Sequence, residues 1–320
     1  MRRLGESAAF VLFLVLLGSR VVAAQGPIPI SECGTITRPG NYVFANDVIL
    51  DTSDYNYDDF GQGGNCLTID AAQVNLNMNG WAIGIACPPL GFSYCPSAFG
   101  VPGGIAIEVT AKANHVSISN GSTDGFVYGL VVEGASHLSV TDLDLRAVVG
   151  LTLENATHGT FTNVSMIAGD TSYHGSNGPV LYMHGGNHNI FSNLGGFGLG
   201  DDLGSGPSGI EIENSSYNSV SGANIEDTSC GNADVLLTNS SFNTITNGSI
   251  FDECGSGIEI DEASQHNSVS GNTVSIASPT DEFAMVDQNP DCGTDIWTNN
   301  VFSNDFAADQ ISASPANCIK

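Results

Sequence analysis

An all-β solenoid is the fold class that this sequence predicts: one chain coils through parallel β-strands, and each turn of the coil pairs with the next. Three observations support this prediction. One short phrase recurs along the chain, apolar residues alternate within each copy, and no long window beyond the first two dozen residues shows the period of a helix. The phrase is clearest as GIEIENSSYNSVSG from Gly209, DVLLTNSSFNTITNG from Asp234 and GIEIDEASQHNSVSG from Gly257.

The length of the repeat selects among the solenoids. The segments NSVSG, NTITN and NSVSG start at Asn218, Asn243 and Asn267, so successive copies lie 25 and 24 residues apart. Leucine-rich repeats need a leucine ladder with a helical segment, which these copies lack, and a propeller blade needs about 40 residues. One turn of a parallel β-helix remains, and we expect a single-stranded coil of roughly nine to ten turns.

Alternation within each copy predicts which side chains face the core. Ile210, Ile212, Ile258 and Ile260 occupy alternate positions and are expected to point inward, because successive side chains of a strand point to opposite faces. Asparagine recurs where each copy bends, and it tolerates the left-handed backbone conformation. We expect these asparagines to stack and to bond to their copies above and below: Asn120, Asn163, Asn193 and Asn247.

Several segments resemble a known group of proteins. The entry segment ISECGTITRPGNYVFANDVIL, the segment CLTIDAAQVNLNMNGWAI, and the GI and NSVSG units resemble the right-handed parallel β-helix superfamily of pectate-lyase-like and NosD-like proteins. The resemblance covers nearly all of the chain after residue 24 and implies a right-handed coil. It implies no single reaction, because such coils serve many unrelated activities.

The first residues have the features of a secretory leader. MRRLGESAAFVLFLVLLGSRVVAA carries arginines at its start, an apolar run too short to span a membrane, and a V-A-A ending. We expect cleavage after Ala24 and a single β-helix domain over residues 25–320, with an N-terminal cap at 25–65 and a C-terminal cap at 285–320. The mature protein is expected to be secreted, or periplasmic in a Gram-negative bacterium, and not inserted in a membrane.

The cysteines predict a disulfide-braced coil. An even number in an exported chain indicates disulfides, and no pair has the spacing of a zinc site. Cys230 and Cys254 lie one repeat apart, so their Cα atoms should be within disulfide reach. The remaining expected pairs would close a surface loop and tie down the two ends of the coil: Cys87 with Cys95, Cys33 with Cys66, and Cys292 with Cys318.

The charge of the chain limits its partners. A formal charge of −27 repels nucleic acid and anionic membranes, and it repels acidic polysaccharides unless a divalent cation intervenes. The same charge also serves solubility or calcium loading. Six N-x-S/T sequons would accept glycans in a eukaryotic host, at Asn120, Asn155, Asn163, Asn214, Asn239 and Asn247.

Aligning the copies places outward-facing residues of the first strand of each turn in two vertical columns. One column contains Glu133, Glu154, His184, Glu213, Thr238 and Asp261. The neighbouring column contains Val131, Thr152, Tyr182, Glu211, Leu236 and Glu259. In related β-helix enzymes this strand face forms the sugar-binding cleft, as the resemblance implies.

Two long insertions converge on the same face. IAGDTSYHGSNG ends just before the turn with Tyr182 and His184, and LGGFGLGDDLGSGPSG ends just before the turn with Glu211 and Glu213. We therefore predict a site for acid–base glycoside chemistry or for Ca²⁺, since stacked carboxylates raise each other's pKa and a histidine among them can act as a base or ligand. The candidate set is Asp170, His174, Tyr182, His184, Asp201, Asp202, Glu154 and Glu213. A solvated acidic face with a surface histidine is the alternative.

Comparison with known mechanisms leaves the reaction open. Polygalacturonase-like hydrolases are matched only by the pair Asp201-Asp202, and their R-I-K motif is absent. Pectate-lyase-like elimination needs calcium and a basic residue, for which Arg146 is the candidate. Epimerase-like enzymes are matched by Tyr182 and His184, but without the accompanying Asp-Pro.

A second series of acidic pairs recurs after the second alternating stretch of each copy. It suits Ca²⁺ ligation or a solvated turn, and it includes Asp227 and Asp252. The other histidines show no metal-ligand spacing and are interpreted as surface or turn residues: His115, His137, His158, His188 and His266.

The leading hypothesis is a carbohydrate-interacting protein of the polysaccharide lyase, epimerase or hydrolase type, which works through the face of Tyr182 and His184. The competing hypothesis is a non-catalytic extracellular module that binds calcium or glycan.

Overall fold

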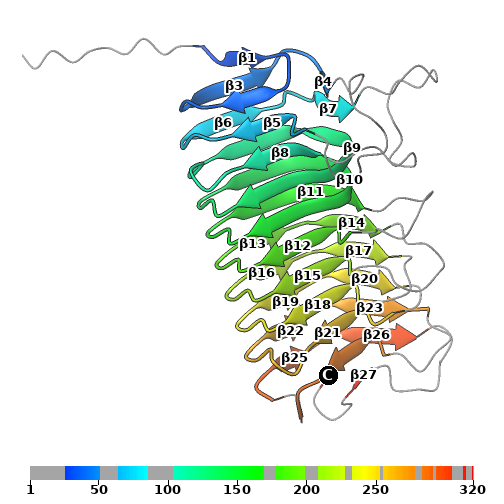
Figure 1. Cartoon of the computed structure of the whole chain (residues 1–320). Helices are drawn as coiled ribbons and strands as arrows, with labels where there is room; N and C mark the ends of the chain where they lie inside the picture. Colours follow the sequence, from blue (N-terminus) through cyan, green and yellow to red (C-terminus); the bar gives the residue numbers. More distant parts are fainter. Residues whose placement is uncertain are drawn as a thin grey trace, which may run out of the picture.

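The structure is a computed structural model that describes residues 26–50, 64–85, 104–168, 178–198, 208–227, 233–252, 255–277, 283–290, 293–304, 313–314 and 319. The described chain winds through ten turns of a coil, and every strand pairs in parallel with strands one turn before or after it (Figure 1). This confirms the parallel β-helix and the number of turns. Within these ranges, no helix has the length and hydrophobicity that crossing a membrane requires.

Each turn passes through three sheets that run the length of the coil. Sheet 1 contains β2 (Gly34–Ile36), β5 (Leu67–Ile69), β8 (Ile105–Val109), the last parts of β9 (Ser117–Glu133) and β10 (Ser139–Glu154), β12 (Leu181–His184), β15 (Ile210–Glu213), β18 (Val235–Thr238), β21 (Ile258–Ile260), β24 (Met285–Asp287) and β27 (Ala313–Ser314).

Sheet 2 follows sheet 1 along the chain. It contains β1 (Ile28–Ile30), β3 (Gly40–Phe44), β6 (Val74–Asn77), the first parts of β9, β10 and β11 (Thr160–Ala168), β13 (Ile190–Ser192), β16 (Ser219–Ser221), β19 (Thr244–Thr246), β22 (Ser268–Ser270) and β25 (Ile296–Thr298).

Sheet 3 closes each turn. It contains β4 (Val48–Leu50), β7 (Ala82–Ile85), the middle parts of β9 and β10, the end of β11, β14 (Gly195–Gly198), β17 (Asn224–Asp227), β20 (Ser249–Asp252), β23 (Thr273–Ile276) and β26 (Val301–Asn304).

The core is one continuous stack of apolar side chains inside the coil. Ile210, Ile212, Ile258 and Ile260 are all 0% exposed, as the alternation predicts. Aromatic rings stack in the same way, and the rings of Phe161 and Phe191 lie 4.8 Å apart between centroids. Identical inward positions on successive turns therefore share one narrow core.

A ladder of buried asparagines runs beside the apolar core. The side-chain oxygen of Asn243 accepts hydrogen bonds from the backbone N–H of Asn218 at 2.9 Å and from its side-chain amide at 3.1 Å. Asn189 bonds to Asn218 and Asn243 bonds to Asn267 through the same atoms. Each rung thereby satisfies backbone groups that would otherwise be buried without partners.

The outer bends follow the prediction for asparagine. Asn120, Asn163, Asn193 and Asn247 all have φ between 54° and 58°. The side-chain amide of Asn193 donates to the oxygen of Asn163 at 3.2 Å, which confirms the stacking of these side chains. Glycine takes the same place on other turns, because it also adopts positive φ at little cost.

The disulfide expected between Cys33 and Cys66 is present, with the two Cα atoms 4.6 Å apart. The other six cysteines lie outside the described residues, and so does the predicted leader. The segments assigned to the caps contain β1–β4 and β24–β27, whose pairing continues the ladders of the coil.

The asparagine ladder ends on a carboxylate, and this predicts a pH-dependent stability. One side-chain oxygen of Asp295 accepts from the backbone N–H of Asn267 at 2.6 Å, and burial raises the pKa of Asp295 to about 6. A carboxyl whose pKa is higher in the folded protein than in the unfolded chain binds its proton more tightly in the folded state. The free energy of unfolding therefore falls as the pH rises from about 4 to about 6. In Asp295→Asn the fall in the free energy of unfolding should be smaller by about 1 kcal/mol. This figure is reduced because the carboxylate is half exposed and solvent screens it.

The measurement is the melting temperature of the wild type and of Asp295→Asn across that pH range. Asp142→Asn, a carboxylate-to-amide change at an exposed bend, is the matched control. An equal pH slope in wild type and Asp295→Asn would contradict the assignment.

Candidate functional site

Both columns expected on the outer face of sheet 1 are present in register. Glu133, Glu154, His184, Glu213 and Thr238 are successive backbone partners, and Asp261 follows on the next turn, where it accepts the N–H of Asn239. Val131, Thr152, Tyr182, Glu211, Leu236 and Glu259 form the second column without a gap. Sequence spacing alone was therefore sufficient to place these side chains.

The centre of these columns is a cluster of six side chains on three successive turns, which we call the three-turn site. Its members are Thr152 and Glu154 on β10, Tyr182 and His184 on β12, and Glu211 and Glu213 on β15. They point outward because side chains alternate along a strand and the residues before and between them point into the core. Those inward residues are fully buried: Leu151, Leu153, Leu181, Met183, Ile210 and Ile212.

His184 and Glu154 form one pair of this site. The Nδ1 atom of His184 lies 3.0 Å from a carboxylate oxygen of Glu154. Both side chains are more than one third exposed, so the pair faces solvent. A carboxylate at Nδ1 orients the ring and leaves Nε2 directed elsewhere for hydrogen bonding.

Tyr182 and Glu213 form the second pair. The hydroxyl of Tyr182 donates to Glu213 at 2.8 Å, and the amide of Asn214 donates to the other carboxylate oxygen at 3.1 Å. Burial, together with the hydrogen bond to Glu213, raises the pKa of Tyr182 well above its usual range, so its hydroxyl keeps its proton. The rings of Tyr182 and His184 are parallel within 2°, with centroids 6.4 Å apart.

Glu211 differs from the other two glutamates of the site. It lies two residues before Glu213 on one strand, about 6.6 Å away between Cα atoms. Burial raises the pKa of Glu211, and the charge of Glu213 raises it further. The site thus combines a carboxyl whose pKa is raised with two carboxylates that form hydrogen bonds to neighbouring side chains.

Thr152 completes the cluster. Its side chain is 7% exposed, although it belongs to an outward column, and its hydroxyl oxygen has no hydrogen-bond partner among the described residues. A buried hydroxyl without a partner is costly in a folded protein, and this oxygen is covered by neighbouring groups and does not face solvent.

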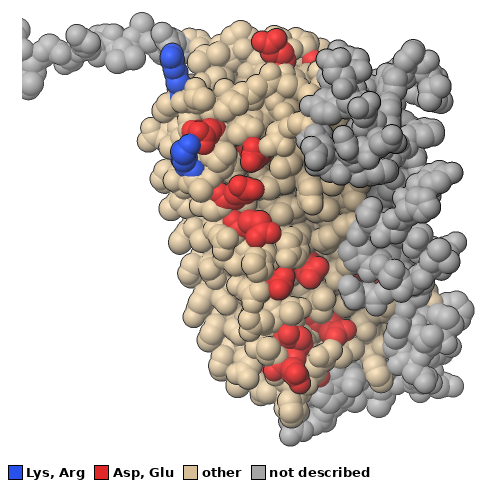
Figure 2. All heavy atoms as spheres, in the orientation of Figure 1, with Lys and Arg blue, Asp and Glu red and all other residues tan. Residues whose placement is uncertain are grey.

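Acidic side chains extend the site along the coil. Figure 2 shows them in a line on the face viewed, with basic side chains only near the end that carries the first turns. Lys112, near that end, is paired with Asp70 at 3.0 Å. The face around the three-turn site is therefore negatively charged.

Arg146 lies on a different sheet from Tyr182 and His184. It belongs to the part of β10 in sheet 3, where its guanidinium pairs with Asp144 at 3.0 Å. No contact within the described part of the chain joins Arg146 to the three-turn site, and its predicted part in catalysis remains a prediction.

The remaining predicted ligands divide into two groups. Asp170, His174, Asp201, Asp202 and the side chain of Asp227 lie outside the described residues. Asp252 is 1% exposed and accepts the backbone N–H of Gly255, so it lies inside the coil and not on a solvated turn. Among the described residues, no three acidic, histidine or cysteine side chains gather closely enough to hold a metal ion.

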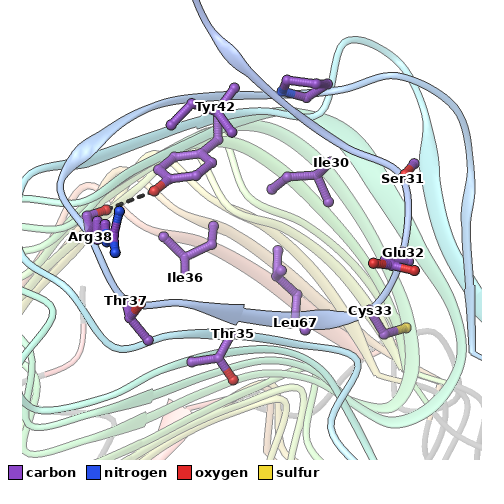
Figure 3. A pocket seen from close by; sticks show the side chains of 13 residues that line it. Ile30, Ser31, Glu32, Cys33, Thr35, Ile36, Thr37, Arg38, Tyr42 and Leu67 are labelled. Atoms are coloured by element: carbon purple, nitrogen blue, oxygen red, sulfur yellow. Dashed lines mark hydrogen bonds between the residues drawn. The ribbon is translucent and has the colours of Figure 1, made fainter.

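A concave feature at the N-terminal end of the coil has a structural explanation. A cavity of about 290 Å³ opens there, with Ile30, Ile36, Tyr42 and Leu67 in its lining (Figure 3). The hydroxyl of Tyr42 donates to the carbonyl of Arg38 at 2.9 Å on its rim. Because these apolar side chains continue the core, the cavity is the open end of the coil.

Sequence reasoning placed Glu211 and Thr152 in a column but left both out of the candidate set. The signal for Glu211 was present in the alternation of GIEIE, which puts two glutamates on one outer face. No signal in the sequence indicated that Thr152 would be buried, because that depends on its surroundings in space.

Comparisons with known proteins agree with this architecture. The family described as a right-handed β-helix region matches residues 128–319. A search of curated proteins gave no match. Similar solved structures include DFA-IIIase from Arthrobacter chlorophenolicus without its lid, at 13% identity and a TM-score of 0.54 over 88% of this chain and 81% of that one.

Two further structures are similar. The A-module of the mannuronan C-5 epimerase AlgE4 from Azotobacter vinelandii has 10% identity and a TM-score of 0.50, over 87% of each chain. The Dettilon tailspike protein has 12% identity and a TM-score of 0.50, over 86% of this chain and 60% of the tailspike. At such identities the likeness shows a shared fold. Because the family match covers more than half of the sequence, the chain belongs to the right-handed β-helix family.

Proposed function

We propose that this protein binds a neutral polysaccharide across the three-turn site and hydrolyses its glycosidic bonds. One observation carries the proposal: Glu211 and Glu213 share an outer strand face, with Tyr182 bonded to Glu213 and the His184–Glu154 pair on the adjacent turns. Hydrolysis of glycosides requires two carboxyl groups, one as an acid and one as a carboxylate.

Glu211 is the proposed general acid. It gives its proton to the oxygen of the leaving sugar as the bond between that oxygen and the anomeric carbon breaks. Its raised pKa supports this role, because the protonated form persists to higher pH than in an exposed glutamate.

Glu213 is the proposed carboxylate partner. It accepts hydrogen bonds from Tyr182 and Asn214, which hold its carboxylate in position. It takes a proton from water as the water oxygen bonds to the anomeric carbon, so one water molecule is consumed for each bond broken. His184, oriented by Glu154, is proposed to position the sugar through Nε2.

The charge of the site favours a neutral substrate. A polyuronate brings one carboxylate per sugar, and Glu154, Glu211 and Glu213 would repel these charges. The epimerase of similar fold acts, by its name, on mannuronan, which supports a role in carbohydrate chemistry in general. With the predicted leader, the activity would lie outside the cell or in the periplasm.

A non-catalytic glycan-binding module is the second candidate. The position of Arg146 favours it, because the arginine is paired on sheet 3 and offers no base beside the sugar for an elimination reaction.

A screen for reducing ends tests the proposal. Soluble neutral and acidic oligosaccharides are incubated with the protein, with and without Ca²⁺, and shortened products are expected from neutral substrates. His184→Ala and Glu154→Gln should each lower the rate by about 100-fold or more. Glu133→Gln, one turn away in the same column, should not. Activity that is unchanged in His184→Ala would refute this choice of site.

A further inference from the structure

The outer face of sheet 2 is a regular array of hydroxyl groups, which we call the hydroxyl face. Its first column consists of Ser117, Ser139, Thr160, Ile190, Ser219, Thr244, Ser268 and Ile296. Its second column consists of Ser119, Thr141, Thr162, Ser192, Ser221, Thr246, Ser270 and Thr298. In Figure 1 the strands β13, β16, β19, β22 and β25 of this sheet follow one another down the coil.

The array is periodic in two directions. Successive turns place equivalent hydroxyls about 4.8 Å apart, and the two columns are about 6.6 Å apart along each strand. The side chains between the columns point inward and are buried, including Ile118, Val140, Phe161 and Phe191. The face therefore presents a pair of hydroxyls on six of eight successive turns, and Ile190 or Ile296 takes the first-column position on the other two.

These hydroxyls are available for a ligand. Within the described part of the chain, only Ser119 among them has a hydrogen bond to another protein group, from the side chain of Asn120 at 3.5 Å. None of the sixteen positions carries a charge, although the chain has a formal charge of −27. The face thus combines unused hydroxyls with an absence of charged groups.

Two further rows border the hydroxyl face. Two residues before the first column, exposed rings stack with centroids 4.6 to 5.1 Å apart: His115, His137, His158, His188, Tyr217, Phe242 and His266. All seven have positive φ, so each occupies the same bend of its turn. The asparagine bends lie on the opposite border, directly after the second column, and Asp142 is the acidic residue in that row.

The stack also refines one interpretation of the sequence. These histidines do lie on exposed turns, as expected, and their rings are also aligned one above another. Their stacking follows from the repeat, because the same bend occurs at the same position of every turn.

Strand propensity favours the threonines of the array but does not explain its serines. Strands favour β-branched and aromatic residues, and serine is neither, yet it occupies eight of the sixteen positions. The equivalent positions of sheet 3 also accept charged and apolar residues. One of its outer columns contains Asp124, Arg146, Ile167, Phe197, Glu226, Phe251, Ser275 and Ser303.

We propose that the hydroxyl face binds an extended neutral polysaccharide whose sugars lie along the coil. A polymer of this kind is uncharged, repeats at regular intervals, and offers hydroxyl donors and acceptors to match those of each turn. The amides and ring edges of the bordering rows add hydrogen-bonding groups on both sides. The inference adds a second face to the proposed function for the same class of polymer, but its argument uses no residue of the three-turn site.

The test measures depletion of the mature protein by insoluble cellulose, chitin and β-1,3-glucan. The wild type is expected to bind at least one of them. Ser192→Ala, Ser221→Ala and Thr246→Val, combined in one variant, remove three neighbouring hydroxyls and should weaken binding at least about tenfold. The matched control, Thr273→Val with Ser275→Ala and Ser303→Ala, makes the same changes on the outer face of sheet 3 and should bind like the wild type.

Further measurements separate the possible outcomes. Binding should be insensitive to high salt, because no charge takes part. Ser221→Tyr, which places one bulky ring on the flat face, should also weaken binding, and it serves if the triple variant does not fold. Hydrolysis of soluble oligosaccharides should survive these changes, because none of the changed residues belongs to the three-turn site.

Three results would overturn the inference. They are absence of binding to all three polymers, equal loss of binding in the sheet 3 control, and shaping of ice crystals by the wild type without polysaccharide binding. The last result would assign the array to ordered water instead.

Discussion

Glu211→Gln is expected to lower the hydrolysis of neutral oligosaccharides by 100- to 10,000-fold, the usual cost of removing a general acid. Gln keeps the shape of the side chain but has no proton to give to the leaving sugar. In the wild type, burial and the neighbouring Glu213 raise the pKa of Glu211, so activity should fall as the pH rises through that pKa. The measurement is the initial rate across the acid and neutral pH range.

A matched control exists in the same column. Glu259 is also partly buried, burial also raises its pKa, and it lies two turns beyond Glu211. Glu259→Gln should therefore leave the rate unchanged. A substrate with an activated leaving group, such as a nitrophenyl glycoside, needs no proton and should restore much of the activity of Glu211→Gln. Equal losses on both substrates would indicate a structural role and not an acid.

Asn243→Leu is expected to lower the free energy of unfolding by about 3–5 kcal/mol, because several buried hydrogen bonds lose their partner together. The oxygen of Asn243 accepts two bonds from Asn218, and its amide donates to the carbonyl of Ser215 at 3.0 Å and to Asn267 at 3.3 Å. Leucine has a similar volume, so the variant leaves little cavity. The loss of stability therefore reflects the buried polar groups that are left without hydrogen-bond partners.

Chemical denaturation followed by tryptophan fluorescence measures this effect. Trp297 is buried in the later turns, where it donates to Asp287, and it reports on the part of the coil beyond Asn243. Asn247→Gly, four residues away on an outer bend, is the control and should be nearly neutral, since glycine occupies the same bend at Gly222 and Gly271. Similar losses for both variants would disprove a special role for the buried ladder.

The sequence was sufficient for the parts of the fold that the repeat itself determines. The columns of sheet 1, the inward isoleucines and the left-handed asparagines follow from spacing, because stacked turns place equal positions above one another. The aromatic stack follows from the same rule, yet it was missed because its members change between His, Tyr and Phe.

Other features depend on surroundings that spacing does not specify. Asp252 falls at an inward position of β20, so it is buried although acidic residues usually face solvent. Arg146 belongs to the same strand as Glu154, but β10 continues from sheet 3 into sheet 1 between them. The burial of Glu211 and Thr152 arises from neighbours in space, which the sequence of one turn does not reveal.

The buried asparagine ladder has a consequence for how such a chain changes its length. Asn189, Asn218 and Asn243 each bond to the next asparagine through the same pair of atoms, so every layer offers its neighbours an identical joint. Deletion of one full turn would place Asn218 next to Asn267, and these two side chains would form the same hydrogen bonds as the present pairs. Duplication or loss of whole layers is thus an inexpensive route by which evolution lengthens or shortens both outer faces at once.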